Sequence, residues 1–397
     1  MQISNFVNRF GETQTLLMAK LTRELISRGI DVINLSLGEP DFDTPEHIKT
    51  AAKNALDEGY TKYTPVSGIL ELKKAICTKF ENDNNLYFQP ENIIISTGAK
   101  QSLANAILAI INEGDEAIIP TPYWVTYSAQ VEMALGKPVF VHCDVSQQFK
   151  MTPAQLEAAI NDKTRLLIFS SPCNPSGAIY TKEELAGLVK VIEKYPEVYV
   201  ISDEIYEYIN YEGVHESIAQ FETIKDRVIL INGFSKGYAM TGWRLGYLAA
   251  SVPIVKACEK IQGQFTSGAN SIAQHAAVAA VLGSQDPTKE MVKAFKARRD
   301  YFLNALSEIE GFQVIIPQGA FYAFPNIKYF LGKKDKKGRV INNADDFAIF
   351  LLNSANVSGV SGAAFGNDGC IRFSYATSLE NLHEAIKRIK EAVGSLE

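Results

Sequence analysis

Positive charge and long apolar runs are both scarce in this sequence. The 397 residues carry a formal net charge of −6, and the sequence pI is near 5.6. A protein that binds nucleic acid or an anionic membrane needs a net basic face, so this balance argues against both kinds of partner. No apolar run is long enough to span a bilayer, and the first twenty residues are too polar for a signal peptide. We therefore expect no nucleic-acid partner and no membrane partner.

Cysteine and histidine are also scarce, and neither occurs at the spacing of metal ligands. The chain has five of each, all scattered, with no Cys-x-x-Cys pair. This usage is typical of reduced thiols and argues against both a disulfide framework and a zinc site. We expect a cytoplasmic protein with no metal. A nicotinamide dehydrogenase is disfavoured as well, because no Gly-x-Gly-x-x-Gly motif follows a strand near the start of the chain.

Short β-branched runs alternate with longer helical patterns between about residues 90 and 250. This alternation predicts a parallel sheet flanked by helices. A helix is expected over 101–111. Thr181, with Glu184 three positions later, predicts the start of another helix. The expected strands span 92–96, 116–119, 138–141, 165–170, 198–202, 228–232 and 245–250.

The pattern changes after about residue 290. There we expect a smaller α+β domain, with helices over 291–308 and 344–354, a strand at 371–375 and a last helix from Glu380. Extended segments are expected at 313–316 and 320–324. The first 45 residues are expected to form an arm and a loop. Because 397 residues exceed the usual size of one domain, we divide the chain into 1–45 (the arm and part of the small domain), 46–290 (the large domain) and 291–397 (the C-terminal small domain).

Unusual polar residues follow several of the expected strands, at the edge of a parallel sheet where ligands bind. Gly98-Ala99-Lys100 lies at a strand-to-helix turn. Backbone N–H groups at such a helix start can hold a phosphate, although many turns of this kind hold none. Trp124 follows the next strand, where it could cover a flat ring or simply pack in the core.

Three further strand ends carry side chains that suit a ligand. Asn174 lies in a turn fixed by two prolines and a glycine, which is equally typical of a purely structural turn. Asp203 ends a hydrophobic strand, where a carboxylate is costly to bury unless it meets a cation or a donor, and Tyr206 follows one helical turn later. Lys236 and Arg244 lie in an apolar, glycine-rich region, where a desolvated lysine becomes a nucleophile for carbonyls.

Together these groups fit a single ligand better than they fit separate structural explanations. They supply a lysine nucleophile, an aromatic face, an acid, a phenol, an arginine suited to phosphate and a helix N-terminus. An aromatic aldehyde that carries a phosphate and a basic ring nitrogen would use all of them.

Seven short motifs recur along the chain in a characteristic order and spacing. They are Gly38-Glu39-Pro40-Asp41-Phe42, Lys62-Tyr63, Pro122-Tyr123-Trp124, Asn174-Pro175-x-Gly177, Ser202-Asp203-Glu204-Ile205-Tyr206, Ser235-Lys236 with Gly242-Trp243-Arg244, and Ile371-Arg372-Phe373-Ser374. This set resembles that of the class I aminotransferases, which are pyridoxal-phosphate enzymes of fold type I. The resemblance covers essentially the whole chain and looks closest to the prokaryotic aspartate aminotransferase branch. It implies a large domain with a mixed, mostly parallel seven-stranded sheet between helices, plus a smaller α+β domain.

The resemblance implies a role for each matching residue. Lys236, Asp203 and Tyr206 would be catalytic: Lys236 would carry the cofactor, Asp203 would pair with its ring nitrogen, and Tyr206 would bond its ring oxygen. The residues implied to bind pyridoxal phosphate are Gly98, Ala99, Lys100, Trp124, Asn174, Asp203, Tyr206, Ser235, Lys236 and Arg244, with Tyr63 contributed from one subunit to the other. The residues implied to bind substrate are Gly38, Trp124, Asn174, Arg372, Lys100, Thr13 and Thr15.

The activity implied by the resemblance is ping-pong transfer of an amino group between L-aspartate or L-glutamate and 2-oxoglutarate or oxaloacetate. A homodimer with shared active sites would carry it out. Lys100, Thr13 and Thr15 would grip the side-chain carboxylate of the substrate, and the same grip admits prephenate. An ordinary solvated lysine at a helix start explains Lys100 as well.

Other activities remain open at this point. The first alternative is an aminotransferase of the same fold that acts on prephenate, aromatic or neutral amino acids. A carbon–sulfur lyase of this fold is another. A binding module without activity is disfavoured, because no basic DNA-binding extension accompanies the motifs.

The chain departs from the family pattern in two places. Gly233 stands where the family often has a serine that binds the phosphate, so that contact would come from elsewhere, for example Ser235. The arginine that animal and enteric aspartate aminotransferases send across from the partner subunit cannot be placed in this sequence.

Overall fold

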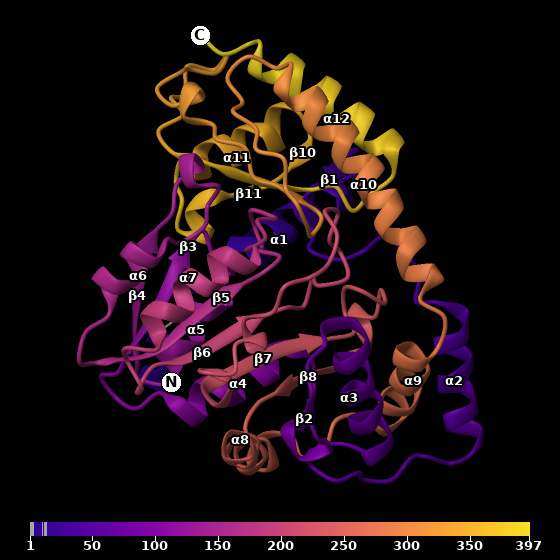
Figure 1. Cartoon of the computed structure of the whole chain (residues 1–397). Coiled ribbons are helices and arrows are strands. Elements are labelled where there is room, and N and C mark those ends of the chain that lie inside the picture. Colours follow the sequence, from indigo (N-terminus) through magenta and orange to yellow (C-terminus); the bar gives the residue numbers. More distant parts are fainter. Residues whose placement is uncertain (1–3, 10, 12–13) are drawn as a thin grey trace.

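A seven-stranded sheet forms the centre of the larger part of the molecule (Figure 1). The computed structural model describes residues 4–9, 11 and 14–397. In spatial order the strands are β2-β8-β7-β6-β5-β3-β4. β8 runs antiparallel to both of its neighbours and the other pairs are parallel, so the sheet is mixed and mostly parallel, as predicted. The bounds are β2 Ile93–Ser96, β3 Glu116–Thr121, β4 Lys137–His142, β5 Thr164–Ser170, β6 Tyr199–Asp203, β7 Val228–Gly233 and β8 Gly246–Ala249.

Helices cover both faces of this sheet, because alternate strand residues point to opposite sides. Ile93 and Ile95 of β2 pack in one apolar cluster, with residues of α2, α3, α7 and α9. Ile94 packs in the cluster on the other face, with residues of α4, α5 and α8. The helices of this part are α2 Glu46–Asp57, α3 Leu70–Asn84, α4 Ala99–Ile110, α5 Thr126–Met133, α6 Pro153–Ala159, α7 Lys182–Ile192, α8 Val252–Phe265 and α9 Ser271–Leu282.

The predicted start of α7 is confirmed in detail. The Thr181 hydroxyl accepts a hydrogen bond from the Glu184 backbone N–H at 3.2 Å, and the Glu184 carboxylate accepts one from the Thr181 N–H at 2.8 Å. This reciprocal pair is the capping box that the sequence indicated.

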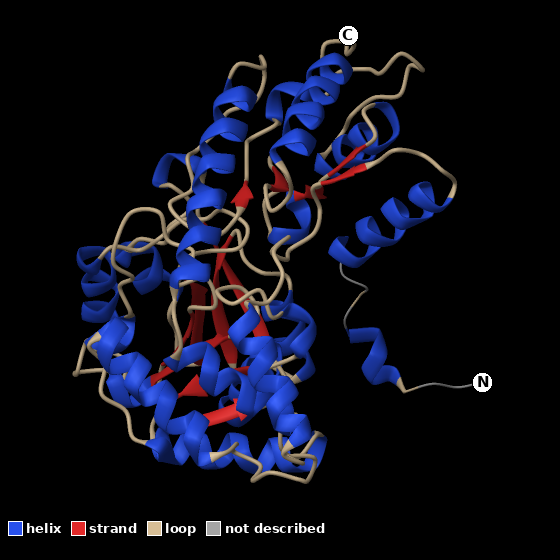
Figure 2. Ribbon diagram, turned by 90° about the vertical axis from the view of Figure 1, so that its right-hand side faces the viewer, coloured by secondary structure: helices blue, strands red, loops and turns tan. Residues whose placement is uncertain are grey.

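A second apolar core lies in the smaller part of the molecule, which joins the N-terminal segment to the C-terminal third of the chain (Figures 1 and 2). β1 Ile33–Asn34 pairs in parallel with β10 Val357–Ser358. β11 Val360–Ser361, β12 Ile371–Ser374 and β9 Tyr322–Ala323 form a small antiparallel sheet. The helices here are α1 Gln14–Ser27, α10 Asp286–Ser307, α11 Ala344–Ser354 and α12 Leu379–Val393.

Two expectations for these segments need correction. The N-terminal residues contain the 14-residue helix α1, where we expected only an arm and a loop. Met18 of this helix is buried in the second core, so packing rather than a start signal accounts for it. The expected extended segment at 313–316 forms only a single bridge, between Gln313 and Asn326.

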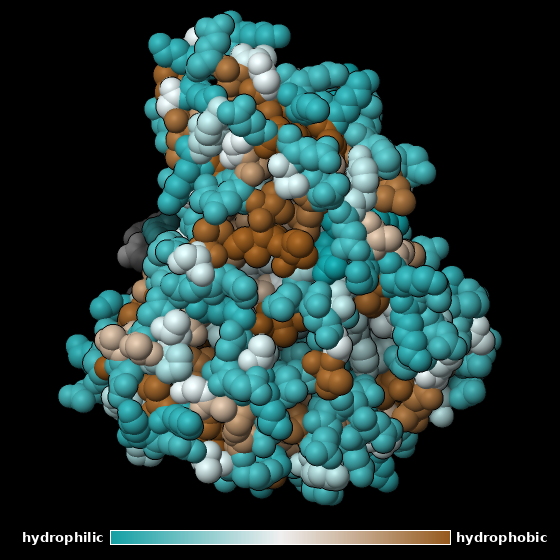
Figure 3. All heavy atoms as spheres, turned by 45° about the horizontal axis from the view of Figure 1, so that its top comes forward, coloured by the Kyte–Doolittle hydropathy of each residue, from teal (hydrophilic) through white to brown (hydrophobic). Residues whose placement is uncertain are grey.

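Polar side chains cover most of the face drawn in Figure 3, and apolar atoms gather in its middle, between the upper and lower parts of the view. In the part of the chain that the structure describes, no helix is long and apolar enough to cross a membrane. Short 3₁₀ helices connect the main elements at Asn5–Arg9, Pro90–Asn92, Val145–Gln147, Ile218–Gln220, Lys225–Arg227, Thr241–Trp243, Lys328–Phe330 and Gly362–Phe365.

Candidate active site

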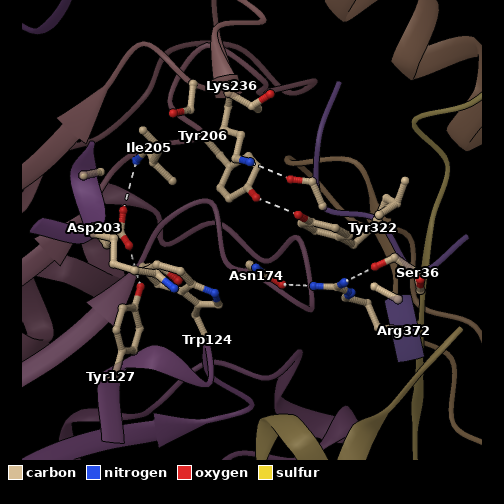
Figure 4. A pocket seen from close by; sticks show the side chains of 18 of the residues that line it. Ser36, Trp124, Tyr127, Asn174, Asp203, Ile205, Tyr206, Lys236, Tyr322 and Arg372 are labelled. Atoms are coloured by element: carbon tan, nitrogen blue, oxygen red, sulfur yellow. Dashed lines mark hydrogen bonds between the residues drawn. The ribbon is translucent and has the colours of Figure 1, made fainter. Parts of the chain in front are cut away.

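A cavity of about 350 Å³ opens where the carboxyl ends of β5, β6 and β7 meet the small antiparallel sheet (Figure 4). Its walls come from segments that lie far apart in the chain. The lining residues are Ala19, Ser36, Leu37, Gly38, Ala99, Lys100, Trp124, Tyr127, Ser170, Asn174, Asp203, Ile205, Tyr206, Ser235, Lys236, Thr241, Arg244, Tyr322 and Arg372. Of the predicted site residues whose side chains the structure describes, all line this cavity except Gly98, which adjoins it at the start of α4, and Tyr63.

Lys236 follows β7 and extends into the cavity. Its ammonium donates a hydrogen bond to the backbone carbonyl of Gly38 at 2.5 Å. Burial lowers the pKa of Lys236 to about 8; the charges of Arg372 and Arg244 add to this, while Glu39 and Asp203 oppose it. A lysine in this range is partly neutral near physiological pH and can act as a nucleophile or a base.

Asp203 ends β6 and is buried at the inner wall of the cavity. Its carboxylate accepts hydrogen bonds from the Tyr127 hydroxyl at 2.8 Å and from the backbone N–H of Ile205 at 3.2 Å. Burial raises its pKa to about 6, despite these two donors. No basic side chain forms an ion pair with it among the described residues, so this carboxylate is suited to receive a cation from a ligand.

Tyr206 lies one turn beyond Asp203 and is buried. Its hydroxyl is 2.7 Å from the hydroxyl of Tyr322, a residue of β9. Burial raises the pKa of both phenols, so both keep their protons at neutral pH.

Arg372 is a buried guanidinium on β12. It donates to the Asn174 side-chain oxygen at 3.0 Å and to the Ser36 carbonyl at 2.8 Å. Its Nε atom is buried without a hydrogen-bond partner. The cation has no carboxylate partner within the described part of the chain, which suits it to bind one from a ligand.

The turn at Gly98 forms a cradle against Arg244. Gly98 has φ +84°, and a Cβ atom there would lie 2.5 Å from Arg244 Nη2. α4 begins at Ala99, and a Cβ atom at Gly246 would lie 2.2 Å from the Ala99 nitrogen. Glycine at both positions lets the helix N-terminus and the guanidinium approach closely, as a phosphate site requires.

Lys100 and Trp124 lie together at the cavity wall. The Lys100 ammonium is 5.0 Å from the centroid of the Trp124 ring. Desolvation lowers the pKa of Lys100, and the charge of Arg244 adds to this. Trp124 meets Tyr127 edge-on, with ring centroids 5.7 Å apart.

The remaining predicted residues are Tyr63, Thr13 and Thr15. The side chain of Tyr63 is fully exposed and does not line the cavity of its own chain. Thr13 lies outside the described residues, and Thr15, although within α1, has a side chain that also lies outside them.

Two lining residues, Tyr127 and Tyr322, were not singled out from the sequence. Tyr127 could have been found, because it lies one helical turn after Trp124 and would share its face. Nothing local indicates Tyr322.

The structure gives a reason for the family departure at Gly233. This residue pairs with Gly246 across β7 and β8, and a Cβ atom at position 233 would lie 2.8 Å from the Gly246 Cα. A serine would not fit there without a shift of the backbone. Ser235 lines the cavity.

The residues present fit pyridoxal phosphate. The cradle at Gly98 and Arg244 suits a phosphate, Asp203 is a buried carboxylate without a cation, and Lys236 is a nucleophile with a lowered pKa. Trp124 supplies an aromatic face beside them.

Comparisons with known proteins agree with this geometry. The family profile for aminotransferase class I and II matches residues 30–389. A probable aspartate/prephenate aminotransferase of Rickettsia felis is 45% identical over 396 residues, which cover 99% of this chain and 97% of the relative. The crystal structure of the aspartate aminotransferase from Rhizobium meliloti has a TM-score of 0.97 at 43% identity and covers 100% of both chains.

A second solved structure, the aspartate aminotransferase of Thermus thermophilus with maleate, has a TM-score of 0.93 at 36% identity, over 99% of this chain and 100% of that one. Fold, site geometry and relatives thus agree over nearly the whole chain. The chain belongs to the class I and II aminotransferases and is a pyridoxal-phosphate-dependent aminotransferase of fold type I.

Proposed function

We propose that this aminotransferase acts on dicarboxylic substrates and exchanges an amino group between L-aspartate or L-glutamate and 2-oxoglutarate or oxaloacetate. One observation carries the proposal. Besides Lys236, three cationic side chains line the cavity, Arg244, Arg372 and Lys100, and none of the three has a carboxylate partner among the described residues. A phosphate, an α-carboxylate and a second carboxylate are the three anions that would match them.

The cofactor would be held by groups on three sides of the cavity. Arg244, the N–H groups of residues 98–100 and Ser235 would bind the phosphate. Asp203 would pair with the ring nitrogen, while Asn174 and Tyr206 would bond the ring oxygen and Trp124 would stack on the ring. When bound, pyridoxal phosphate supplies an aldehyde for the amino group and a ring that withdraws electrons.

Lys236 would act as the proton carrier of the reaction. Its neutral amine would take the proton from the substrate Cα atom as a general base, and the resulting ammonium would give that proton back as a general acid. The pKa of about 8 that burial produces makes both forms accessible near neutral pH. Asp203 would keep a positive charge on the ring side of the cavity, which favours loss of the Cα proton.

Arg372 would bind the α-carboxylate. Its guanidinium is held by Asn174 and by the carbonyl of Ser36, with Nε unpartnered. These contacts fix the plane of the guanidinium before a substrate arrives, so little order is lost on binding. The backbone N–H of Gly38 would lie near the same carboxylate.

Lys100 would bind the second carboxylate and so set the substrate class. Lys100 is exposed, but its ammonium lies 5.0 Å from the centroid of the Trp124 ring at the cavity wall and pairs with no acidic side chain among the described residues, which supports this role. Thr13 and Thr15 would assist from the N-terminal segment, and both assignments remain predictions. The same grip would also accept prephenate, which the name of the Rickettsia felis relative includes.

We infer in addition that the protein works as a homodimer with shared active sites. The fully exposed phenol of Tyr63 supports this, because the resemblance assigns Tyr63 to the phosphate of the neighbouring subunit. The large domain over 46–290 and the small domain built from 1–45 and 291–397 are proposed as the two bodies that close on the substrate. The cytoplasmic location expected from the sequence stays a prediction.

The substrate assignment is tested by Lys100→Ala, with Lys182→Ala as the matched control. Like Lys100, Lys182 is an exposed lysine at a helix start, at the first position of α7, but it lies outside the cavity. Loss of a charge-assisted contact predicts that Lys100→Ala lowers kcat/KM for L-aspartate by about 10- to 100-fold. For L-alanine and L-phenylalanine we expect changes of less than about threefold, and Lys182→Ala should change none of the three.

Equal losses on all three amino acids would remove the role of Lys100. In that case the better assignment is an aminotransferase for aromatic or neutral amino acids. If Lys100→Ala lowers kcat/KM for prephenate as much as for L-aspartate, Lys100 binds a carboxylate of both substrates.

A further inference from the structure

Tyr322 lies at the junction of the two parts of the site. It belongs to β9 in the small sheet, where Ser374 of β12 is its pairing partner. Its side chain is 1% exposed, yet its hydroxyl lines the cavity. Figure 4 shows it between Tyr206, which lies in the turn after β6, and Arg372, which belongs to β12.

The Tyr322 hydroxyl contacts the hydroxyl of Tyr206 at 2.7 Å. No other hydrogen bond of either hydroxyl occurs among the described residues. Each phenol has one proton, so only one of the two can donate in this contact. If Tyr206 gives its proton to a ligand in the cavity, Tyr322 must be the donor between them.

The Tyr322 ring contacts Arg372. The guanidinium carbon lies 4.5 Å from the centroid of the Tyr322 ring and 4.9 Å from the centroid of the Phe365 ring. Stacking of a guanidinium on aromatic faces holds its plane through a cation–π attraction. With Asn174 and Ser36 bonded to its Nη atoms, Arg372 is thus oriented by rings as well as by hydrogen bonds.

The absence of a side chain at Gly38 leaves room for the Tyr322 hydroxyl in the cavity wall. A Cβ atom at position 38 would lie 2.8 Å from the Tyr322 hydroxyl. The carbonyl of the same glycine accepts the hydrogen bond from Lys236. Tyr322 therefore contacts two groups that face the reaction, Tyr206 and Arg372, and its hydroxyl occupies the space that a side chain at position 38 would need.

We propose that Tyr322 is a positioning residue with two separable functions. Its hydroxyl donates to Tyr206, which directs the Tyr206 proton into the cavity and strengthens the bond that Tyr206 makes there. Its ring holds the Arg372 guanidinium in the orientation that binds a carboxylate. This inference rests on the roles proposed above for Tyr206 and Arg372.

Two substitutions separate the functions. Tyr322→Phe removes only the hydroxyl and keeps the ring, whereas Tyr322→Leu removes both. The first measurement is a pH titration of the visible absorbance band of the holoenzyme, with Tyr206→Phe as the comparison. A donor that stabilises the ionised ring oxygen lowers the midpoint, so its loss raises the midpoint.

We expect Tyr206→Phe to raise the midpoint, and Tyr322→Phe to raise it in the same direction by about half a pH unit. An unchanged or lowered midpoint in Tyr322→Phe, beside a raised one in Tyr206→Phe, would overturn the hydroxyl function. No shift in Tyr206→Phe would instead remove the role proposed for Tyr206, and the hydroxyl function of Tyr322 would fall with it.

The second measurement is the dissociation constant of maleate for each holoenzyme, followed by the same absorbance band. Tyr322→Phe should stay within about twofold of the parent protein, because the ring is retained. Tyr322→Leu should weaken binding by about tenfold. Equal affinities for the Leu and Phe variants would overturn the ring function, while circular dichroism confirms that both variants are folded.

Discussion

Asp203 and Glu204 are adjacent in the chain and similarly buried, at 4% and 1% exposed, but they face opposite environments. Asp203 faces the cavity, has two hydrogen-bond donors and has a pKa raised by burial to about 6. Glu204 faces a closed network and accepts hydrogen bonds from Ser202 at 2.9 Å and Ser217 at 2.8 Å, with His215 Nε2 also 2.9 Å away.

The network behind the cavity also contains an ion pair. Glu207 forms an ion pair with the buried Lys79. A carboxylate oxygen of Glu204, one of Glu207 and a ring nitrogen of His215 lie within 4.8 Å of one another, and the Lys79 ammonium supplies a cation to this cluster. The comparison teaches that burial alone does not indicate function. A buried charge that forms no ion pair within the protein marks the ligand site, whereas a buried charge that is paired supports the structure around it.

The largest effect is expected when Lys236, in the cavity, is compared with Lys79, in the network behind it. Lys236→Met removes the group that carries the cofactor and moves the proton, so kcat should fall by at least about 10³-fold. The visible absorbance band of the bound cofactor should be lost as well. Steady-state kinetics and an absorbance spectrum measure both.

Lys79→Met is the matched control, because it removes a buried lysine that has a partner. It leaves Glu207 buried without its cation, so the free energy of unfolding should fall by about 3–5 kcal/mol. The kcat of the protein that remains folded should change by less than about threefold. If Lys79→Met abolished turnover while stability was unchanged, the distinction between the two regions would fail.

The smaller test compares the two carboxylates in cofactor-free protein. The pKa of Asp203 is raised from 3.8 to about 6 in the folded state. Between these values the folded protein binds more protons than the unfolded chain, so the free energy of unfolding falls as the pH rises across this window and stays low above it. Asp203→Asn should therefore remove this loss and stabilise the cofactor-free protein by about 1–3 kcal/mol at pH 8, since each pKa unit corresponds to about 1.4 kcal/mol.

Urea unfolding at about pH 4 and pH 8 measures this effect. Glu204→Gln is the control, since it disturbs a carboxylate that is already satisfied and should destabilise the protein by about 1–3 kcal/mol. A stabilising Glu204→Gln, or an Asp203→Asn that destabilises as much at pH 8, would contradict the account. Asp203→Asn should at the same time lose most of its aminotransferase activity.

The strands of the central sheet could be predicted to within two residues, because buried β-branched runs and helical periods alternate there. The ends of these strands then indicated Asp203, Asn174, Lys236 and Trp124, which the structure brings to one cavity. The short strands β1, β10 and β11 have two residues each, too few for any periodicity to reveal.

Residues that depend on long-range pairing could not be predicted from local pattern. Tyr322 reaches the cavity only because β9 pairs with β12, some 50 residues later in the chain. The helix α1 lies near the start of the chain and carries no acidic residue in its first turn, so no start signal marked it. The closeness of Gly233 to Gly246 likewise depends on the register of two strands.

The most direct test of the central claim is the absorbance spectrum of the holoenzyme before and after mixing with L-aspartate, L-alanine or L-phenylalanine. The holoenzyme should have a visible band from its cofactor. Because Arg244, Arg372 and Lys100 have no carboxylate partner among the described residues, we expect L-aspartate to convert this band faster and more completely than either neutral amino acid does. Faster conversion by the neutral amino acids would contradict the dicarboxylate assignment and the role of Lys100. Absence of any band, even after pyridoxal phosphate is supplied, would contradict the role of Lys236.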